Sequence, residues 1–380
     1  MQSIKARTIY TGKKKVENAH LVFDRDKVIG VSRSRRGKLA GQCRVITPAF
    51  IDPHAHIGMH RAGEPAAEAE ANVKLDSIIT LADALDSVQM DDSSFGDSVR
   101  AGVLYSCVVP GSGNIIGGRG AVIRNFASGT NEALVARGGI KGAFGYNPMS
   151  TRDWKGARPW TRMGALSLLR SKLDAVRAKM DKRKRLPAGK KRDVEFSAEE
   201  EVVRALLERR EVFRVHVHKA DDIDALLRIV DEFKLRVTCE HTMDVNDARV
   251  YETLRKRGIP VVYGPLDSFA YKVELRHKDP LNARLLLESG VEFGLMTDHP
   301  VILQQTMLMT LRWFLRAGLT KGGALEVATR RNAAILGLGG KLGTLEKGKW
   351  ASFVCWSGDP FDLASRALEV YGEGKVVYRE

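Results

Sequence analysis

The sequence predicts an α/β fold: a (β/α)8 TIM barrel with a small β-sandwich formed by the N- and C-terminal segments. Three observations support this prediction. Apolar, β-branched runs alternate with helical patterns, eight such runs are present, and polar residues collect where the runs end. Apolar strands joined by helices favour parallel pairing, with a doubly wound open sheet as the alternative. The polar strand ends favour the barrel, because all eight ends then meet at one mouth.

The predicted elements follow one another in regular order. Strands are expected at residues 49–56, 103–110, 121–126, 140–146, 212–218, 236–241, 259–265 and 292–299. Helices are expected from residue 221 and over 246–257, 282–289, 304–317 and 324–336. Gly258 and Gly290 directly follow two of these helices and are expected to end them.

The two ends of the chain have a different pattern from the middle. Residues 1–47 and 341–380 alternate in strand-like fashion between turn signals, with strands expected at 353–356 and 375–378. We therefore expect 1–47 and 341–380 to form the β-sandwich domain, and 48–340 to form the barrel. A charged insertion is expected within the barrel at about 150–211, with helices near 166–180 and 199–210.

The formal net charge of +15 is unevenly distributed. Residues 1–47 carry +9 and residues 141–195 carry +11, so the remainder sums to −5. Basic clusters at 13–15, 182–185 and 190–192 could attract nucleic acid or anionic lipid. No aromatic residue interleaves the clusters at 182–192, as base stacking would require. We interpret the charge as a solvated surface and expect no nucleic-acid partner.

The chain has the composition of a cytoplasmic protein. Its four cysteines, Cys43, Cys107, Cys239 and Cys355, are scattered without a CxxC pair, which suits a reducing compartment. No apolar run approaches the roughly 20 residues needed to span a bilayer, and the N-terminus has no apolar signal core. We therefore expect cytoplasmic localisation without membrane contact, and a homo-oligomer is compatible with the sequence.

Histidines gather at the ends of the predicted strands. His54 and His56 are two residues apart, so their side chains share one face of a strand. An HxH pair alone can arise by chance, but two adjacent imidazoles also form half of a metal site. Six of the nine histidines lie at or beside strand ends: His54, His56, His216, His218, His241 and His299. This clustering favours a metal site at the barrel mouth.

Several segments resemble the amidohydrolase superfamily, metal-dependent hydrolases built on a (β/α)8 barrel. The likeness is greatest to its imidazolonepropionase-related branch and extends over nearly the whole chain. The segments that carry it are 48–56 (PAFIDPHAH), 110–114 (PGSGN), 143–148 (AFGYNP), 161–164 (TRMG), 218–222 (HKADD), 297–298 (TD) and 342–349 (LGTLEKGK).

The resemblance implies a site with a divalent metal, zinc first, with iron or manganese as alternatives. The implied metal ligands are His54, His56, His218, His241 and Asp298. Asp298 would also act as general base towards a metal-activated water and then return the proton to the leaving nitrogen. His216 would orient a ligand or contact substrate.

The number of metal ions depends on Lys141. The resemblance implies that this residue, once carboxylated, bridges two ions, because a buried lysine beside cations favours the neutral amine that reacts with carbon dioxide. A plain lysine that contacts substrate, or one at the outer barrel surface, is the alternative.

Other candidates are less specific. Tyr146, Arg162 and His299 could line the substrate pocket, or could be a loop residue, a surface charge and a helix-start residue. Residues 111–118 could be a phosphate loop, but the GxGxxxG spacing favours a loop at the mouth. Asp52 shares the face of His54 and could orient a ligand imidazole, or it could close a turn before Pro53.

These features favour a metal-dependent hydrolase of carbon–nitrogen bonds in a cyclic amide, an amidine or a dipeptide-like small molecule. The alternative is a non-catalytic metal-binding scaffold that docks an acidic partner or nucleic acid through its basic segments. The general base Asp298 favours the enzyme, since a scaffold does not need one.

Overall fold

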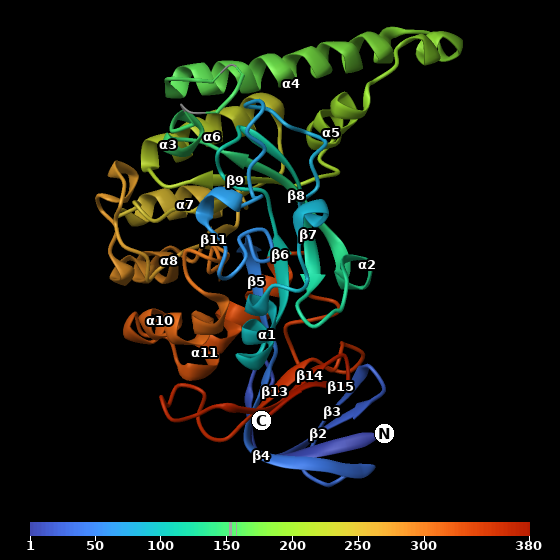
Figure 1. The fold of residues 1–380 in the computed structure, drawn as a ribbon, viewed down its shortest axis with the longest axis vertical. Coiled ribbons are helices and arrows are strands. Elements are labelled where there is room, and N and C mark those ends of the chain that lie inside the picture. The colour runs from blue at the N-terminus through green and yellow to red at the C-terminus, as the bar shows by residue number, and fades with distance from the viewer. Residues whose placement is uncertain (152–153, 157) are drawn as a thin grey trace.

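The computed structural model describes residues 1–151, 154–156 and 158–380 of the chain (Figure 1). The long helix α4 lies at one end of the molecule, a seven-stranded sheet lies at the other, and an eight-stranded sheet lies between them. Among the described residues, no helix has both the length and the apolar character needed to cross a membrane.

The eight-stranded sheet is a nearly closed barrel, as predicted. Its strands are β5 (Phe50–Ala55), β6 (Val103–Val108), β7 (Ile116–Arg124), β8 (Leu134–Ala143), β9 (Phe213–Val217), β10 (Val237–His241), β11 (Val261–Tyr263) and β12 (Phe293–Leu295). Backbone bonds just beyond the ends of β12 and β5 join its two edges: His56 N donates to His299 O at 2.9 Å, and Asp298 N donates to His54 O at 3.2 Å. These closing bonds bring the predicted site residues of the first and last strands together.

The expectation of parallel pairing is wrong for one strand. β7 pairs antiparallel with both β6 and β8, whereas the other pairs in this sheet are parallel. Only a short loop joins β6 to β7, and only the four-residue helix α2 (Thr130–Ala133) lies between β7 and β8. Parallel neighbours need a crossover of a dozen or more residues, so these connections restrict β7 to a hairpin arrangement.

The predicted helices are present, but those expected at 304–317 and 324–336 are each divided into shorter pieces, and the helices Ser93–Arg100 and Tyr146–Met149 were not predicted. The helices that cover the barrel are α1 (Ser93–Arg100), α3 (Tyr146–Met149), α4 (Arg162–Arg185), α5 (Ala198–Leu207), α6 (Ala220–Phe233), α7 (Ala248–Lys256), α8 (Ala283–Ser289), α9 (Met307–Thr310), α10 (Arg312–Arg316), α11 (Lys321–Glu326) and α12 (Asn332–Ile335). Short 3-10 turns are Ala66–Glu68, Ala84–Ser87, Ala188–Asp193, Val273–Leu275, Pro280–Asn282 and Gln304–Thr306, and a π-turn covers Val327–Arg331. Gly258 and Gly290 follow α7 and α8 at positive φ, as expected of helix-ending glycines.

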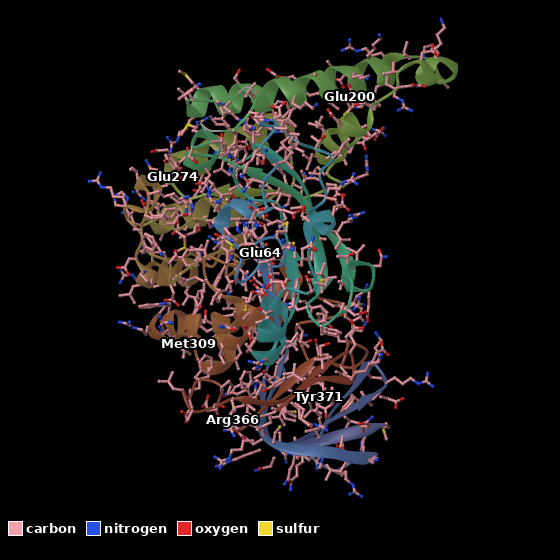
Figure 2. The ribbon with its side chains drawn as sticks, in the orientation of Figure 1. Glu64, Glu200, Glu274, Met309, Arg366 and Tyr371 are labelled. Atoms are coloured by element: carbon pink, nitrogen blue, oxygen red, sulfur yellow. The ribbon has the colours of Figure 1, made fainter. Side chains whose placement is uncertain are left out.

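The predicted charged insertion contains α4 and α5. Ala165, Leu169, Leu173 and Val176 recur on one face of α4 and are buried, whereas its last turn is basic and has no buried residue. Glu200 of α5 lies beside α4, where it accepts from Lys179 at 2.6 Å (Figure 2). The first part of α4 therefore packs on the body of the protein, and its basic end extends beyond it (Figure 1).

Both ends of the chain build the seven-stranded sheet, which matches the predicted β-sandwich. Its strands are β1 (Gln2–Tyr10), β2 (Lys15–Asp24), β3 (Lys27–Ser32), β4 (Lys38–Pro48), β13 (Phe353–Trp356), β14 (Ala367–Gly372) and β15 (Lys375–Arg379), in the spatial order β15-β14-β13-β4-β1-β2-β3.

This sheet curls over a core of its own. In a flat sheet β2 and β13 would be about 14 Å apart, because β1 and β4 lie between them. The rings of Phe23 on β2 and Phe353 on β13 are nevertheless 5.4 Å apart between centroids. Tyr371 of β14 stacks on Phe353 at 4.5 Å (Figure 2). The two halves of the sheet therefore face each other across these aromatic rings.

Candidate metal centre

Histidines from three strands converge with Asp298 at the carboxyl-terminal end of the barrel. Two overlapping groups of side chains have their nitrogen or oxygen atoms within 4.8 Å of one another. One group is His216, His218 and His241, and the other is His54, His241 and Asp298. The structure thus brings together residues that are far apart in the chain. It also places His216 beside His241, with their ring centroids 4.0 Å apart.

A buried carboxylate sets the tautomer of His54. His54 Nδ1 lies 2.5 Å from Glu240 Oε2, and both side chains are fully buried. Burial alone would raise the pKa of Glu240, but Arg214 and His54 lower it to about 2. The ionised carboxylate can only accept, so His54 Nδ1 carries the proton and Nε2 keeps a free lone pair. Burial lowers the pKa of His54 to about 4, so the ring is neutral at physiological pH.

Two other histidines are oriented by backbone carbonyls. His56 Nδ1 donates to Val109 O at 2.7 Å, and His241 Nδ1 donates to Gly264 O at 3.1 Å. In both rings Nδ1 is therefore occupied, and Nε2 is the nitrogen that can bind a metal. This is the arrangement that orients metal-binding imidazoles.

Several ring nitrogens of the cluster are buried without a hydrogen-bond partner among the described residues. They are His54 Nε2, His241 Nε2, His218 Nδ1 and both nitrogens of His216. Burial lowers the pKa values of His216, His218 and His241 well below the usual range, so these imidazoles too are neutral. Unpaired buried lone pairs are costly unless a ligand uses them. Neutral imidazoles beside a carboxylate therefore fit a divalent metal such as zinc.

Asp298 is the anion at the centre of the cluster. Its Oδ1 lies 3.2 Å from His56 Nε2 and 3.4 Å from His54 Nε2. Burial would raise the pKa of Asp298, but His241, His56 and His54 together hold it well below its usual range. The carboxylate is thus ionised and available as an acceptor.

Asp52 binds backbone and side-chain donors next to the site and does not contact an imidazole ring. It accepts from the backbone N–H of His54 at 3.2 Å, from Gln304 Nε2 at 2.9 Å and from the Thr297 hydroxyl. Burial raises the pKa of Asp52 to about 6. Glu240 takes the role that the sequence suggested for Asp52, because its carboxylate and not that of Asp52 contacts the His54 ring.

Lys141 is fully buried inside the barrel, so it does not lie at the outer surface. Its Nζ donates to Ser112 Oγ at 2.7 Å. Burial lowers the pKa of Lys141 to about 8, although Glu240 and Asp298 oppose the shift. The bridging role of a carboxylated Lys141 stays a prediction.

A cavity of about 200 Å³ opens above the cluster. It is lined by His56, His60, Asn72, Gly111, Ser112, Asn147, His216, His218, His241, Met243, Pro265, Ser268, Tyr271, Leu275, Asp298, Pro300 and Val301. Gly111 and Ser112 take part in this wall, as expected for a loop at the mouth.

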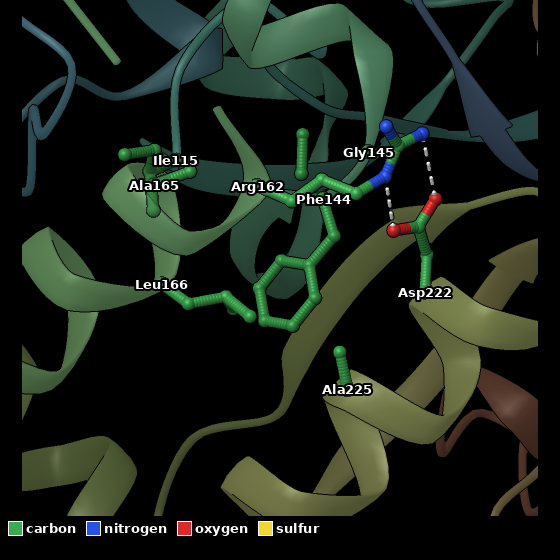
Figure 3. A pocket seen from close by; sticks show the side chains of 9 residues that line it. Ile115, Phe144, Gly145, Arg162, Ala165, Leu166, Asp222 and Ala225 are labelled. Atoms are coloured by element: carbon green, nitrogen blue, oxygen red, sulfur yellow. Dashed lines mark hydrogen bonds and ion pairs between the residues drawn. The ribbon is translucent and has the colours of Figure 1, made fainter. Parts of the chain in front are cut away.

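Three candidate pocket residues lie outside this wall. The Tyr146 side chain is half exposed on α3, while its neighbour Asn147 lines the cavity. His299 is buried, and its ring accepts from the backbone N–H of Gln304 at 3.4 Å. Arg162 lines a separate small pocket, where it donates to Asp222 (Figure 3). None of the three is among the residues that line the cavity at the mouth, and a role of any of them in substrate binding stays a prediction.

Arg162 joins two buried carboxylates. It lies 2.7 Å from Asp222 and 3.2 Å from Glu274, whose side chains are 4% and 3% exposed. We expect Arg162→Met to lower the free energy of unfolding by about 1–3 kcal/mol, because two buried carboxylates lose the partner that they share, although that partner is itself 44% exposed. Urea denaturation measures this change in the free energy of unfolding. Arg170→Met on the same helix removes a more exposed pair with Glu232 and should cost less than about 1 kcal/mol. A raised KM with unchanged stability would instead indicate substrate binding by Arg162.

Two residues of the site were not assigned a role from the sequence. Glu240 and Arg214 form a buried ion pair at 2.8 Å, and Arg214 also donates to Pro53 O at 2.6 Å. Arg214 and Glu240 are the charged residues of two short, buried strands, and this was the available signal in the sequence, since a charge is rarely buried without a partner. Together they hold His54 in place from the side away from the cavity.

Removing one member of this pair should destabilise the fold strongly. Arg214→Met leaves the charge of Glu240 buried without its strongest partner, and we expect a loss of about 3–5 kcal/mol in chemical denaturation. The double variant Arg214→Met/Glu240→Gln removes both charges and should regain part of this loss. A loss in the single variant below about 1 kcal/mol would contradict this account.

Comparison with known proteins bears on the family and the fold of the chain. The model of the amidohydrolase family matches residues 161–378. An amidohydrolase from Thermotoga maritima MSB8 has a crystal structure with a TM-score of 0.92 and 30% identity, each chain being covered completely. A prolidase complexed with N-methylphosphonate-L-proline has a TM-score of 0.62 and 17% identity, again over both whole chains, and shares the fold.

A curated relative, the amidohydrolase tasK of Hapsidospora irregularis, is 24% identical over 364 residues. The match includes 88% of this chain but only 36% of that protein, so the chain spans about a third of its relative's length. The family match covers more than half of the present chain, and the Thermotoga protein matches it from end to end. The chain therefore belongs to the amidohydrolase family, whose members are hydrolases acting on carbon–nitrogen bonds.

Proposed function

We propose that this chain is a metal-dependent amidohydrolase that cleaves a carbon–nitrogen bond in a cyclic amide, an amidine or a dipeptide-like small molecule. The observation that carries the proposal is the set of buried, unpartnered imidazole nitrogens around the ionised Asp298. Such a set is costly in the folded protein unless a cation uses it.

The residues proposed to hold the metal are His54, His56, His218, His241 and Asp298, and His216 offers a nitrogen to the same group. Imidazole and carboxylate donors suit zinc, with iron or manganese as alternatives. When bound, a divalent cation here would polarise the scissile carbonyl and acidify a water molecule. A carboxylated Lys141, formed from its neutral amine, would allow a second ion.

Asp298 has the properties of a general base and acid. Its carboxylate is ionised, borders the cavity and lies beside three imidazoles. It would accept a proton from the attacking water and deliver that proton to the leaving nitrogen. Glu240 would keep the His54 lone pair directed towards the site during this transfer.

The cavity favours a small substrate. Its volume of about 200 Å³ is below the usual range for drug-sized ligands. The resemblance to the imidazolonepropionase-related branch makes an imidazolone ring the first cyclic amide to test. The prolidase neighbour adds dipeptides that end in proline to the panel.

The experiment is a metal add-back assay. The protein is stripped with a chelator, reloaded separately with zinc, manganese or iron, and assayed for C–N hydrolysis of cyclic amides, amidines and dipeptides. We expect no turnover in the stripped protein and restored turnover with at least one metal. Hydrolysis that persists at full rate after the metal has been removed would refute the proposal.

A further inference from the structure

An apolar groove lies between the barrel and the seven-stranded sheet, away from the metal centre. Its volume is about 740 Å³. Figure 2 labels Met309 on the barrel side of this groove and Arg366 on the sheet side. α1, α9 and α10 contribute one wall, while β13, β15 and the loop at residues 357–366 contribute the other.

The lining has the composition of a protein interface. Trp356, Phe361, Tyr378, Met309 and arginines such as Arg366 border the groove. Aromatic residues, methionine and arginine are the types that are enriched where proteins bind one another. Polar side chains also occur along its lining, as in the rim of an interface.

One loop carries a side chain suited to such a groove. Leu363 is 92% exposed, more than any other large hydrophobic residue among those described, and Met309 across the groove is 53% exposed. Both side chains border the hollow. Exposed apolar residues beside an apolar groove are costly in water and mark a surface that another molecule covers.

The loop at residues 357–366 and the opposite wall of the groove carry charges of opposite sign. Asp362, next to Leu363, accepts from the backbone N–H of Ala364 at 3.0 Å, and no salt bridge engages its carboxylate within the described ranges. Arg100 on α1 is 63% exposed, and its ion pair with Asp97 is long at 3.5 Å. A loop that enters the groove from outside would place a carboxylate beside a guanidinium with free donors.

We infer that this groove is the interface between two copies of the chain, with the 357–366 loop of each copy seated in the groove of the other. In a two-fold dimer the same patch meets itself, so one arrangement covers both Leu363 side chains and both grooves. It also pairs Asp362 of each copy with Arg100 of the other. This proposal does not depend on the reaction proposed above.

Sedimentation equilibrium and light scattering on the full chain test the inference. We expect the unchanged protein to be a dimer at micromolar concentration. Leu363→Asp and Met309→Asp should each weaken the dimer at least about tenfold, because each places a charge in an apolar contact. Met163→Asp, at an exposed apolar position on α4, is the matched control and should leave the dimer unchanged.

A charge swap tests the reciprocal arrangement. Asp362→Arg should weaken the dimer through repulsion from Arg100, and the double variant Asp362→Arg/Arg100→Asp should restore it. Circular dichroism on each variant checks that the fold is retained, as expected for exposed positions. A monomeric unchanged protein, a dimer that Leu363→Asp and Met309→Asp leave intact, or an equal loss in Met163→Asp would each overturn the inference.

Discussion

Replacing both His54 and His56 by alanine should abolish bound metal and lower turnover by at least about 10⁴-fold, which is a fraction of the roughly 10⁶–10¹⁷-fold acceleration that enzymes typically achieve. The two rings lie 5.3 Å apart between centroids, and both contact Asp298. Their removal takes two imidazole nitrogens from one side of the site. Metal analysis by mass spectrometry and the add-back assay measure the two effects.

The matched control is His20→Ala. His20 lies on β2 in the seven-stranded sheet, so this variant removes a histidine without changing the barrel mouth. It should keep its metal and its turnover. Full metal content together with unchanged turnover in the double variant would remove the basis for a metal centre at this place.

Asp298→Asn should lower kcat by about 10²–10⁴-fold, the usual contribution of a general acid–base group. Asparagine keeps the shape of the side chain and an oxygen that can coordinate a cation, but it cannot accept a proton at neutral pH. We therefore expect KM to change much less than kcat.

Metal content separates the two roles of Asp298. If the variant retains metal and loses turnover, proton transfer is the missing function. If it loses both, coordination by the carboxylate dominates. Retained turnover with retained metal would contradict the assignment of Asp298 as the base.

The sequence predicted most of the residues that meet at the mouth. Alternation along β5 placed His54 and His56 on one face, and strand ends placed His218, His241 and Asp298 near them. Polar residues at the carboxyl ends of barrel strands can meet nowhere else, and this made the site predictable.

Contacts between side chains on different elements were not predictable in the same way. The pair of Arg214 and Glu240 depends on the register of the neighbouring strands β9 and β10, which no local pattern states. From the sequence Arg162 was a candidate for the substrate pocket or a surface charge, and its carboxylate partners could not be foreseen because they are remote in the sequence. The direction of β7 was missed because alternation indicates a strand without indicating which way it runs.

The seven-stranded sheet also has a consequence for biosynthesis. β4 pairs with β1 on one side and with β13 on the other, and about 300 residues separate β4 from β13 along the chain. At about 5–20 residues per second, a ribosome needs roughly 15–60 s to make that stretch. During this time β4 has an open edge, which can pair with other nascent chains. The terminal sheet can therefore close only after the barrel sequence has been synthesised, and a chain that stops before residue 353 would keep an edge prone to aggregation.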